Sequence, residues 1–242
     1  MEEHEFFLSE PINLVVGKVL SLMGVNVRHG DKIVPDHMIL MLLVGLIIIV
    51  FAVYLRRRLS VDRPGAAQHM IESLVEALRQ QQESIIGHHD YKRYLPFLGT
   101  LGLFILISNL IGLIPYFQSP TANTNLTFGC AIIAFLYYHW QGIRKQGLWH
   151  YLKHFAGPIW WLAPLMIPIE IISHFSRILS LGVRLFANIY GEDMVIAVFA
   201  FLFPLLLPLP LMFLAVFTSV LQAFVFVLLT IIYLAGVVAE EH

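Results

Sequence analysis

Charge is what this sequence has least of. Only 13% of its 242 residues are Asp, Glu, Lys or Arg, about half the share of a soluble domain. The formal net charge is −1 and the pI is near 6.8, which excludes a basic surface for nucleic acid. Hydrophobic residues make up 58% of the chain, so the composition indicates that water is not its main solvent.

Cysteine is almost absent as well. The single one, Cys130, cannot form a disulfide within the chain, and its apolar surroundings favour a packing role. The N-terminus also lacks the basic segment followed by an apolar stretch that a signal peptide requires. We therefore expect the first span to insert uncleaved.

Long apolar runs are abundant. The run 37–56 is long enough, at about 1.5 Å per residue, to cross a hydrocarbon core of roughly 30 Å. Further spans are predicted at 95–117 and 126–142. The segment 64–87 alternates apolar and polar residues at helical spacing, which predicts an amphipathic helix on the membrane surface or against another subunit.

Basic residues accompany these three spans at one side only. Short loops rich in Lys and Arg stay in the cytoplasm. The pattern therefore predicts that the segment 1–36 lies outside and that the C-terminus is cytoplasmic. The basic residues are Arg56, Arg57, Arg58, Arg63, Lys92, Arg93, Arg144, Lys145 and Lys153.

The last third of the chain has a different pattern. The segment 158–203 is too long for one perpendicular span and too charged to face lipid throughout. Pro204, Pro208 and Pro210 interrupt the chain before a last apolar helix, 211–238. Together these segments predict a long tilted helical hairpin. The expected fold is a single all-α integral membrane domain with three roughly perpendicular spans, an amphipathic surface helix and this hairpin.

A polar stripe runs along the first helix of the hairpin. At about 100° per residue, seven polar residues fall within about 80° of the direction of Arg184. Lipid would leave them unsatisfied, so the stripe predicts a hydrated path or a protein interface. His174 lies at its edge, and Asp193 points to the opposite side. The seven are Glu170, Ser173, Arg177, Ser180, Arg184, Asn188 and Glu192.

Arg184 is the residue of the stripe that helix packing alone does not explain. A guanidinium keeps its charge where a lysine can lose it. Unpaired in lipid, it would cost at least ~2.5 kcal/mol. Such a charge favours the ionised form of a carboxylate brought near it and blocks a continuous proton wire past itself.

Simpler interpretations remain open for other residues. The stripe as a whole is compatible with helix packing, and Arg177 with snorkelling to the membrane surface. His139, His150 and His154 lie near a basic loop, where solvation is the ordinary state. Adjacent His88, His89 and Asp90 lack a second ligand pair, so we expect no metal site and no cofactor.

Several motifs resemble subunit a of the F-type ATP synthases. The segment from Ser180 to Asn188, Ser-Leu-Gly-Val-Arg-Leu-Phe-Ala-Asn, is similar to the signature of that family. The stretches 108–115 and 120–125 resemble its second-span and loop pattern, and 221–226 resembles its last-helix motif. Their order and spacing match over nearly the whole chain.

The resemblance implies a function. In that family the a subunit is a stator that packs against a rotating ring of c subunits, each with a carboxylate at mid-membrane. Two offset half-channels bring protons to and from the ring, and the arginine matching Arg184 separates them. Such a chain is no enzyme by itself. Its implied partners are the c-ring, b-type peripheral stalk subunits, the remainder of the Fo F1 complex and lipid, without nucleic acid.

The resemblance also assigns residues to the two half-channels. Asn188 and Gln222 match polar residues that flank the arginine, and Glu192, or else Asp193, takes the place of the outer acid. The cytoplasmic half-channel corresponds to Glu170 and Ser180, to which the stripe adds His174 and Arg177. Asn123 and Asn125 correspond to a polar patch at the outer opening.

Three positions depart from the family pattern. Ala187 stands where a glycine is usual, and Ile178 where a proline is common. Ala215 occupies a position where some members have a histidine partnered with the outer acid. The resemblance therefore does not say what replaces that histidine.

Other functions and settings remain open at this stage. The alternatives are a secondary transporter with an arginine substrate site, against which the lack of repeated halves speaks, and a non-transporting assembly subunit. The coupling ion is H⁺ or Na⁺, with H⁺ expected. The compact length and the lack of a transit peptide favour a bacterial inner membrane.

Overall fold

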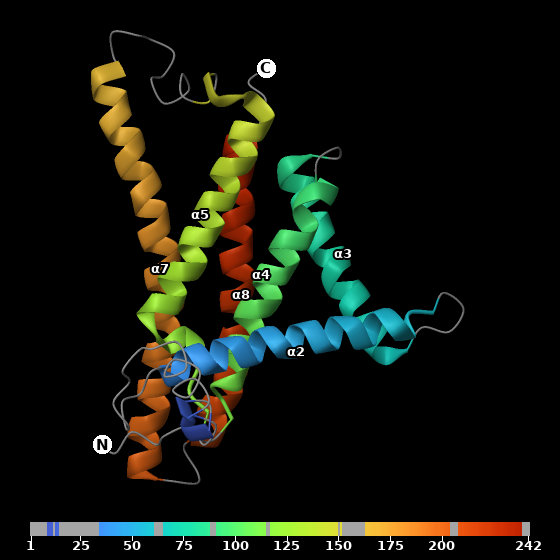
Figure 1. Ribbon diagram of the computed structural model, residues 1–242. Coiled ribbons are helices and arrows are strands. Elements are labelled where there is room, and N and C mark those ends of the chain that lie inside the picture. The colour runs from blue at the N-terminus through green and yellow to red at the C-terminus, as the bar shows by residue number, and fades with distance from the viewer. Residues whose placement is uncertain are drawn as a thin grey trace.

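The computed structural model describes residues 9–11, 13–14, 34–60, 65–87, 91–114, 117–149, 151, 163–203 and 208–238 (Figure 1). Over these residues the chain is helical and contains no strand, which confirms the expected all-α class. Its elements are α2 (Asp36–Arg58), α3 (Ala66–Ile86), α4 (Tyr91–Ile111), the 3-10 turn η1 (Pro120–Ala122), α5 (Thr124–Gln146), α7 (Ala163–Leu202) and α8 (Pro208–Val238).

Four of the described helices are long and apolar enough to cross a membrane: α2, α4, α7 and α8. The helix α5, which lies in the region of the expected third span, is not one of them, although it has 23 residues. The reason is its composition, because Asn125, Thr127, His139 and Gln141 join the basic residues of its last turn. The polar side chains of α5 require protein contacts rather than lipid.

Four helices form the central layer of the molecule. The helix α5 packs against α7 and α8, and α4 packs against α8 (Figure 1). Between them lies a core to which each helix contributes, including Ile105 of α4, Ala134 of α5, Leu185 of α7 and Phe226 of α8. A Cβ at Gly182 would lie 2.9 Å from the ring of Phe128, so the absence of a side chain lets α7 approach α5 closely.

The helix α2 runs across this layer rather than along it (Figure 1). The expected three roughly perpendicular spans therefore do not share one direction, since α4 and α5 follow α7 and α8. The physical reason is packing: α4 buries Leu98 and Ile105 among the long C-terminal helices, whereas α2 contributes few buried residues, among them Leu40 and Val44. The two helices α4 and α5 thus take the direction of the hairpin.

Two of the differences from the expected boundaries have a local physical reason. The helix α4 begins at Tyr91 and ends at Ile111, whereas the expected span was 95–117. The chain turns at Gly112, where an added Cβ would lie 2.4 Å from the Cβ of Ser119, so the returning loop closes on it. The other difference is α8, which begins at Pro208 with the prolines in its first turn, where the missing N–H is harmless. Pro204 lies outside the described residues.

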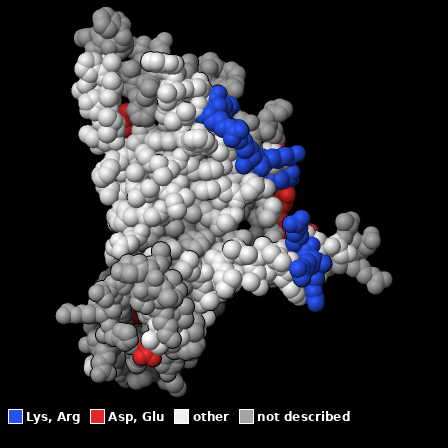
Figure 2. All heavy atoms as spheres, viewed as in Figure 1, with Lys and Arg blue, Asp and Glu red and all other residues white. Residues whose placement is uncertain are grey.

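The helix α3 is amphipathic, as its sequence predicts. On one face, three apolar residues pack against a buried cluster formed mainly by α4 and α8: Leu78, Ile85 and Ile86. On the other face, Met70 and Leu74 are exposed. Figure 2 shows that Lys and Arg gather along one flank of the molecule, while the visible face beside it is nearly free of charge. Arg63 and Lys153, two of the basic residues used to predict the topology, lie outside the described residues.

Candidate functional site

The polar stripe lies on one uninterrupted helix. The helix α7 has 40 residues and continues through Pro168, so Glu170 and Glu192 are about 33 Å apart along its axis. Its buried face is apolar and includes Leu181, Leu185 and Ile189. The stripe lies beside this buried face, at the margin between the protein interior and the uncovered side of the helix.

Arg184 is exposed on this helix. Within the described part of the chain its guanidinium makes no hydrogen bond and no ion pair. The uncovered side next to it is apolar, with Val183, Met194 and Val198 each about half exposed. A permanent charge beside an apolar face, with no partner among the described residues, has the geometry to meet a carboxylate on another chain.

Asn188 and Gln222 link α7 to α8 one turn from Arg184. The amide nitrogen of Asn188 donates a hydrogen bond of 2.5 Å to the side-chain oxygen of Gln222. Gln222 is 3% exposed, and its own amide nitrogen has no partner among the described residues. The sequence assigned both residues to one site, and the structure brings them together.

Glu192 has a partner that the sequence analysis missed. The hydroxyl of Thr218 donates a hydrogen bond of 2.5 Å to the Glu192 carboxylate. The sequence contained a signal for this contact. Thr218 precedes Gln222 by four residues on α8, and Glu192 follows Asn188 by four residues on α7. If Asn188 meets Gln222 between antiparallel helices, Glu192 therefore meets Thr218 one turn away. Ala215 is fully buried, and its carbonyl oxygen also accepts from Thr218 at 3.1 Å.

Asp193 makes no hydrogen bond or ion pair with the described residues. It is partly buried, as Glu192 is, but it is turned away from the stripe by one residue of the helix. Between the two candidate outer acids, Glu192 is the one that contacts α8.

The other end of the stripe is covered by α5. The carboxylate of Glu170 lies 3.2 Å from Nε2 of His174, which is buried. Snorkelling to the membrane surface does not fully describe Arg177, because its guanidinium lies over the ring of Tyr233 on α8, 5.1 Å from the centroid. Ser180 is partly buried between Arg177 and Arg184.

Asn123 and Asn125 have a local structural role. The side-chain oxygen of Asn123 caps α5 by accepting from the backbone N–H of Asn125 at 2.9 Å. Its amide nitrogen lies 3.3 Å from Nδ1 of His37 at the start of α2. Asn125 is exposed. Neither side chain forms a hydrogen bond with a residue of the stripe.

A buried polar chain joins α4, η1 and α8, and it was not foreseen. The hydroxyl of Thr121 donates to the side-chain oxygen of Asn109 at 2.6 Å, and the amide of Asn109 donates to the carbonyl of Ser219 at 3.5 Å. The hydroxyl of Ser119 donates to the carbonyl of Ser108 at 3.1 Å. These residues are all at most 4% exposed, so their bonds hold the 117–122 loop against the helix layer.

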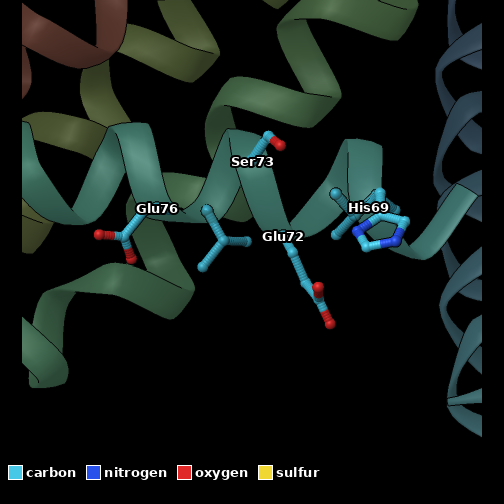
Figure 3. Close-up of a pocket in the computed structure, with 6 residues that line it drawn as sticks. His69, Glu72, Ser73 and Glu76 are labelled. Carbon is cyan, nitrogen blue, oxygen red and sulfur yellow. The ribbon is translucent and has the colours of Figure 1, made fainter. Parts of the chain in front are cut away.

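The surface of α3 has an open hollow that is unrelated to the stripe (Figure 3). Its labelled residues, His69, Glu72, Ser73 and Glu76, all come from this one helix, on the opposite side of the central layer from α7 (Figure 1). The hydrogen bond from Arg79 holds the pKa of Glu76 below its ordinary value. Among the described residues no group of three side chains is arranged to hold a metal. His88, His89, Asp90, His150 and His154 lie outside them.

Comparison with known proteins decides the family. A family model described as the ATP synthase A chain matches residues 38–235, most of this sequence. The chain belongs to the ATP synthase A chain family. The match covers α3, α4, α5 and α7 in full and nearly all of α2 and α8, and it includes the whole polar stripe.

Curated members of the family are similar over nearly their whole length. ATP synthase subunit a of Koribacter versatilis is 41% identical over 98% of this chain and 96% of its own length. The protein of the same name in Solibacter usitatus is 51% identical over 84% of this chain and 86% of its own length. That of Helicobacter hepaticus is 42% identical over 90% of this chain and 95% of its own length. Membership of this family removes support from the alternatives of a secondary transporter and an assembly subunit.

Proposed function

We propose that this chain is the proton-translocating stator subunit of a rotary ATP synthase, with Arg184 as the barrier between two half-channels. The observation that carries the proposal is the exposed guanidinium on the apolar side of α7, without a partner in the described chain. The family supports the stator role and assembly into the ATP synthase complex, in which the chain is a subunit and no enzyme by itself.

The outer half-channel in this proposal comprises the two pairs between α7 and α8. Glu192 with Thr218 takes up a proton, and Asn188 with Gln222 passes it to a carboxylate of the ring. The pairs are one helical turn, about 5.4 Å, apart along α7. The amide nitrogen of Gln222, unpaired among the described residues, is available to a water molecule in this path.

The cytoplasmic half-channel in this proposal follows the other half of the stripe, through Ser180, Arg177, His174 and Glu170. A ring carboxylate that meets Arg184 is favoured in its ionised form, because the opposite charge stabilises it in a low dielectric. It therefore releases its proton to this half-channel. The same positive charge repels a proton that would pass straight from one half-channel to the other.

The lengths of the helices support a tilted hairpin in the membrane. The 40 residues of α7 extend about 60 Å, twice the roughly 30 Å of a hydrocarbon core, whereas the 23 residues of α2 extend about 35 Å. If α2 spans nearly perpendicular, the layer of α4, α5, α7 and α8 lies strongly tilted. A tilted α7 presents a long side to a ring of c subunits.

We further propose the setting of the subunit. The exposed basic residues that end α2 and α5 lie on the cytoplasmic side, and the start of α2 and the loop 117–123 lie outside. The membrane in this proposal is a bacterial inner membrane, in keeping with the organisms of the relatives named above. Besides the c-ring, the partners are the b-type stalk subunits and the lipid around the uncovered faces.

The decisive experiment replaces the arginine. Arg184→Ala should abolish ATP synthesis in energised membrane vesicles while the complex still assembles, and Arg184→Lys should also lose most of it, because a lysine loses its proton in a low dielectric. Val183→Ala, the exposed neighbouring position, serves as the matched control and should retain synthesis. Near-normal synthesis by Arg184→Ala would contradict the proposal.

A further inference from the structure

Four aromatic residues that carry polar groups meet at the cytoplasmic end of the stripe. They are Tyr138, His139 and Tyr151 from α5 and the segment after it, and His174 of α7, and we call them the His–Tyr cluster. Of the four, only His174 was expected near the stripe, at its edge. The sequence gives no reason to bring the other three to it, and it favours a solvated His139.

The cluster is connected by specific polar contacts. The hydroxyl of Tyr138 lies 3.3 Å from Nδ1 of His174, and the hydroxyl of Tyr151 lies 3.0 Å from Nδ1 of His139. The two imidazole rings meet edge to face, with centroids 4.7 Å apart and an interplanar angle of 79°. On its other side, Nε2 of His174 faces the Glu170 carboxylate at 3.2 Å.

Three of the four members of the cluster are buried, and His139 is partly buried. Tyr138 is 1% exposed, and Tyr151 and His174 are each 6% exposed. The ring of Phe135 covers His139 with a centroid distance of 4.1 Å. Buried polar atoms need hydrogen-bond partners, whereas apolar side chains of the same shape would fill this space without them and with little or no loss of stability. A purely structural role does not call for two histidines here.

The position of the cluster connects it to the proton path. His174 precedes Arg184 by ten residues, about 15 Å along α7 toward the end that we place in the cytoplasm. Other titratable or charged groups also face the cluster from the packed elements: Glu170 and Arg177 of α7 and Tyr233 of α8.

The contacts of His174 suit an imidazole that changes its protonation. In the neutral ring, Nε2–H donates to Glu170 and Nδ1 accepts from the Tyr138 hydroxyl. In the charged ring, both nitrogens donate, to the carboxylate and to the tyrosine oxygen. Because the same neighbours satisfy both states, the proton can be gained and lost with little rearrangement.

We propose that His174, with Tyr138 of α5 as its donor and Glu170 as its acceptor, is a proton-transfer residue of the cytoplasmic half-channel. This inference rests on the proposed stator function and adds α5 as a wall of that half-channel. His139 and Tyr151 are positioning residues, which hold the plane of the His174 ring from the side.

The transfer conserves protons at every step. The O–H bond of Tyr138 breaks as an N–H bond forms at Nδ1 of His174, and the tyrosine oxygen takes a replacement proton from water in the stripe. The Nε2–H bond then breaks, and the proton passes to the carboxylate of Glu170. Glu170 releases this proton to cytoplasmic water, and the Nε2–H tautomer of His174 is restored when one chain of cytoplasmic water gives a proton to Nε2 and takes the proton of Nδ1.

The test compares proton-driven ATP synthesis in vesicles that contain the assembled complex. His174→Gln keeps a hydrogen-bond donor and an acceptor in its terminal amide but cannot carry a proton, and it should lower the rate at least about tenfold. Phe175→Leu alters the adjacent, lipid-facing position and should keep the rate within about twofold. A rate for His174→Gln within twofold of the parent would overturn the inference.

A second measurement separates proton transfer from packing. His174→Ala should be slow, and added imidazole should restore at least part of the rate, whereas pyrrole, a ring of the same size without a basic nitrogen, should not. Equal rescue by both rings would show a packing role and refute the inference. Loss of activity in Arg184→Ala with normal activity in His174→Gln would reject only the relay, whereas normal activity in Arg184→Ala would reject the stator function itself.

Discussion

At the scale of single residues, the site depends on the difference between polar groups with a partner in the chain and those without one. Glu192, Asn188 and His174 each have a partner on a neighbouring helix. Arg184 has none in the described chain, which leaves its charge for a group on another subunit. In the proposed function, the paired residues hold the proton path in place, and Arg184 meets the moving ring.

The two adjacent acids should not be equivalent. Glu192→Gln removes the carboxylate that contacts α8, and it should slow proton-driven ATP synthesis about tenfold or more, since acid–base groups contribute at least that much. Asp193→Asn should have a smaller effect, because Asp193 lies off the stripe. Initial rates in energised vesicles measure both. A larger loss in Asp193→Asn would assign the outer acid to Asp193.

Thr218 should matter through its hydroxyl alone. Thr218→Val keeps the shape but leaves the Glu192 carboxylate without its donor, and a hydrogen bond to a charged group is worth about 1.5–3 kcal/mol. We expect roughly tenfold slower synthesis, and near-parental rates in the control Thr218→Ser, which keeps the hydroxyl. If Thr218→Val is as active as the parent, Thr218 does not take the place of the histidine missing at Ala215.

At the scale of elements, the site requires close contact of α7 with α5 and α8. The buried face of α7 is narrow, and Gly182 lies at its closest approach to α5, against Phe128. The tilt of α7 cannot be changed without moving this contact, and with it the polar stripe. The absence of a side chain at Gly182 therefore lets α7 lie close to α5, the two helices that bring His174 and Tyr138 together.

A side chain at Gly182 should separate α5 from α7. In Gly182→Ala the new Cβ meets the Phe128 ring at 2.9 Å, so the ring must shift, and overpacking of this kind costs about 1–3 kcal/mol. The thermal unfolding midpoint of the purified complex should fall. Phe128→Leu in the same chain should recover part of the loss, and Gly129→Ala, where the space is open, should cost less. Equal stability of Gly182→Ala and the parent would contradict the close approach.

At the scale of the whole molecule, one layer of α4, α5, α7 and α8 is crossed by α2 (Figure 1). The layer keeps the buried polar groups away from lipid, while one side of α7 stays uncovered. This arrangement suits a static subunit that receives a second, moving surface. In the proposed orientation, the basic residues that gather on one flank mark the cytoplasmic side (Figure 2).

The orientation can be tested by labelling from either side. In a Cys130→Ser background, Arg144→Cys should react with an impermeant maleimide only from the cytoplasmic side, and Asn125→Cys only from the outer side, since both positions are exposed. Right-side-out and inverted vesicles provide the two directions. Labelling of both positions from the same side would contradict the proposed topology.

The sequence by itself determined the fold class, the apolar helices and the polar stripe. These follow from local pattern: apolar runs require helices in lipid, because every backbone polar group must be bonded internally, and a fixed angle per residue places Glu170, Arg184 and Glu192 on one face. Only the tertiary structure decided the partners of that stripe. Thr218, Tyr138 and His139 reach it from α8 and α5, and the crossing of α2 depends on how the side chains of several helices pack together. Such contacts join residues far apart in the chain, and no local spacing encodes them.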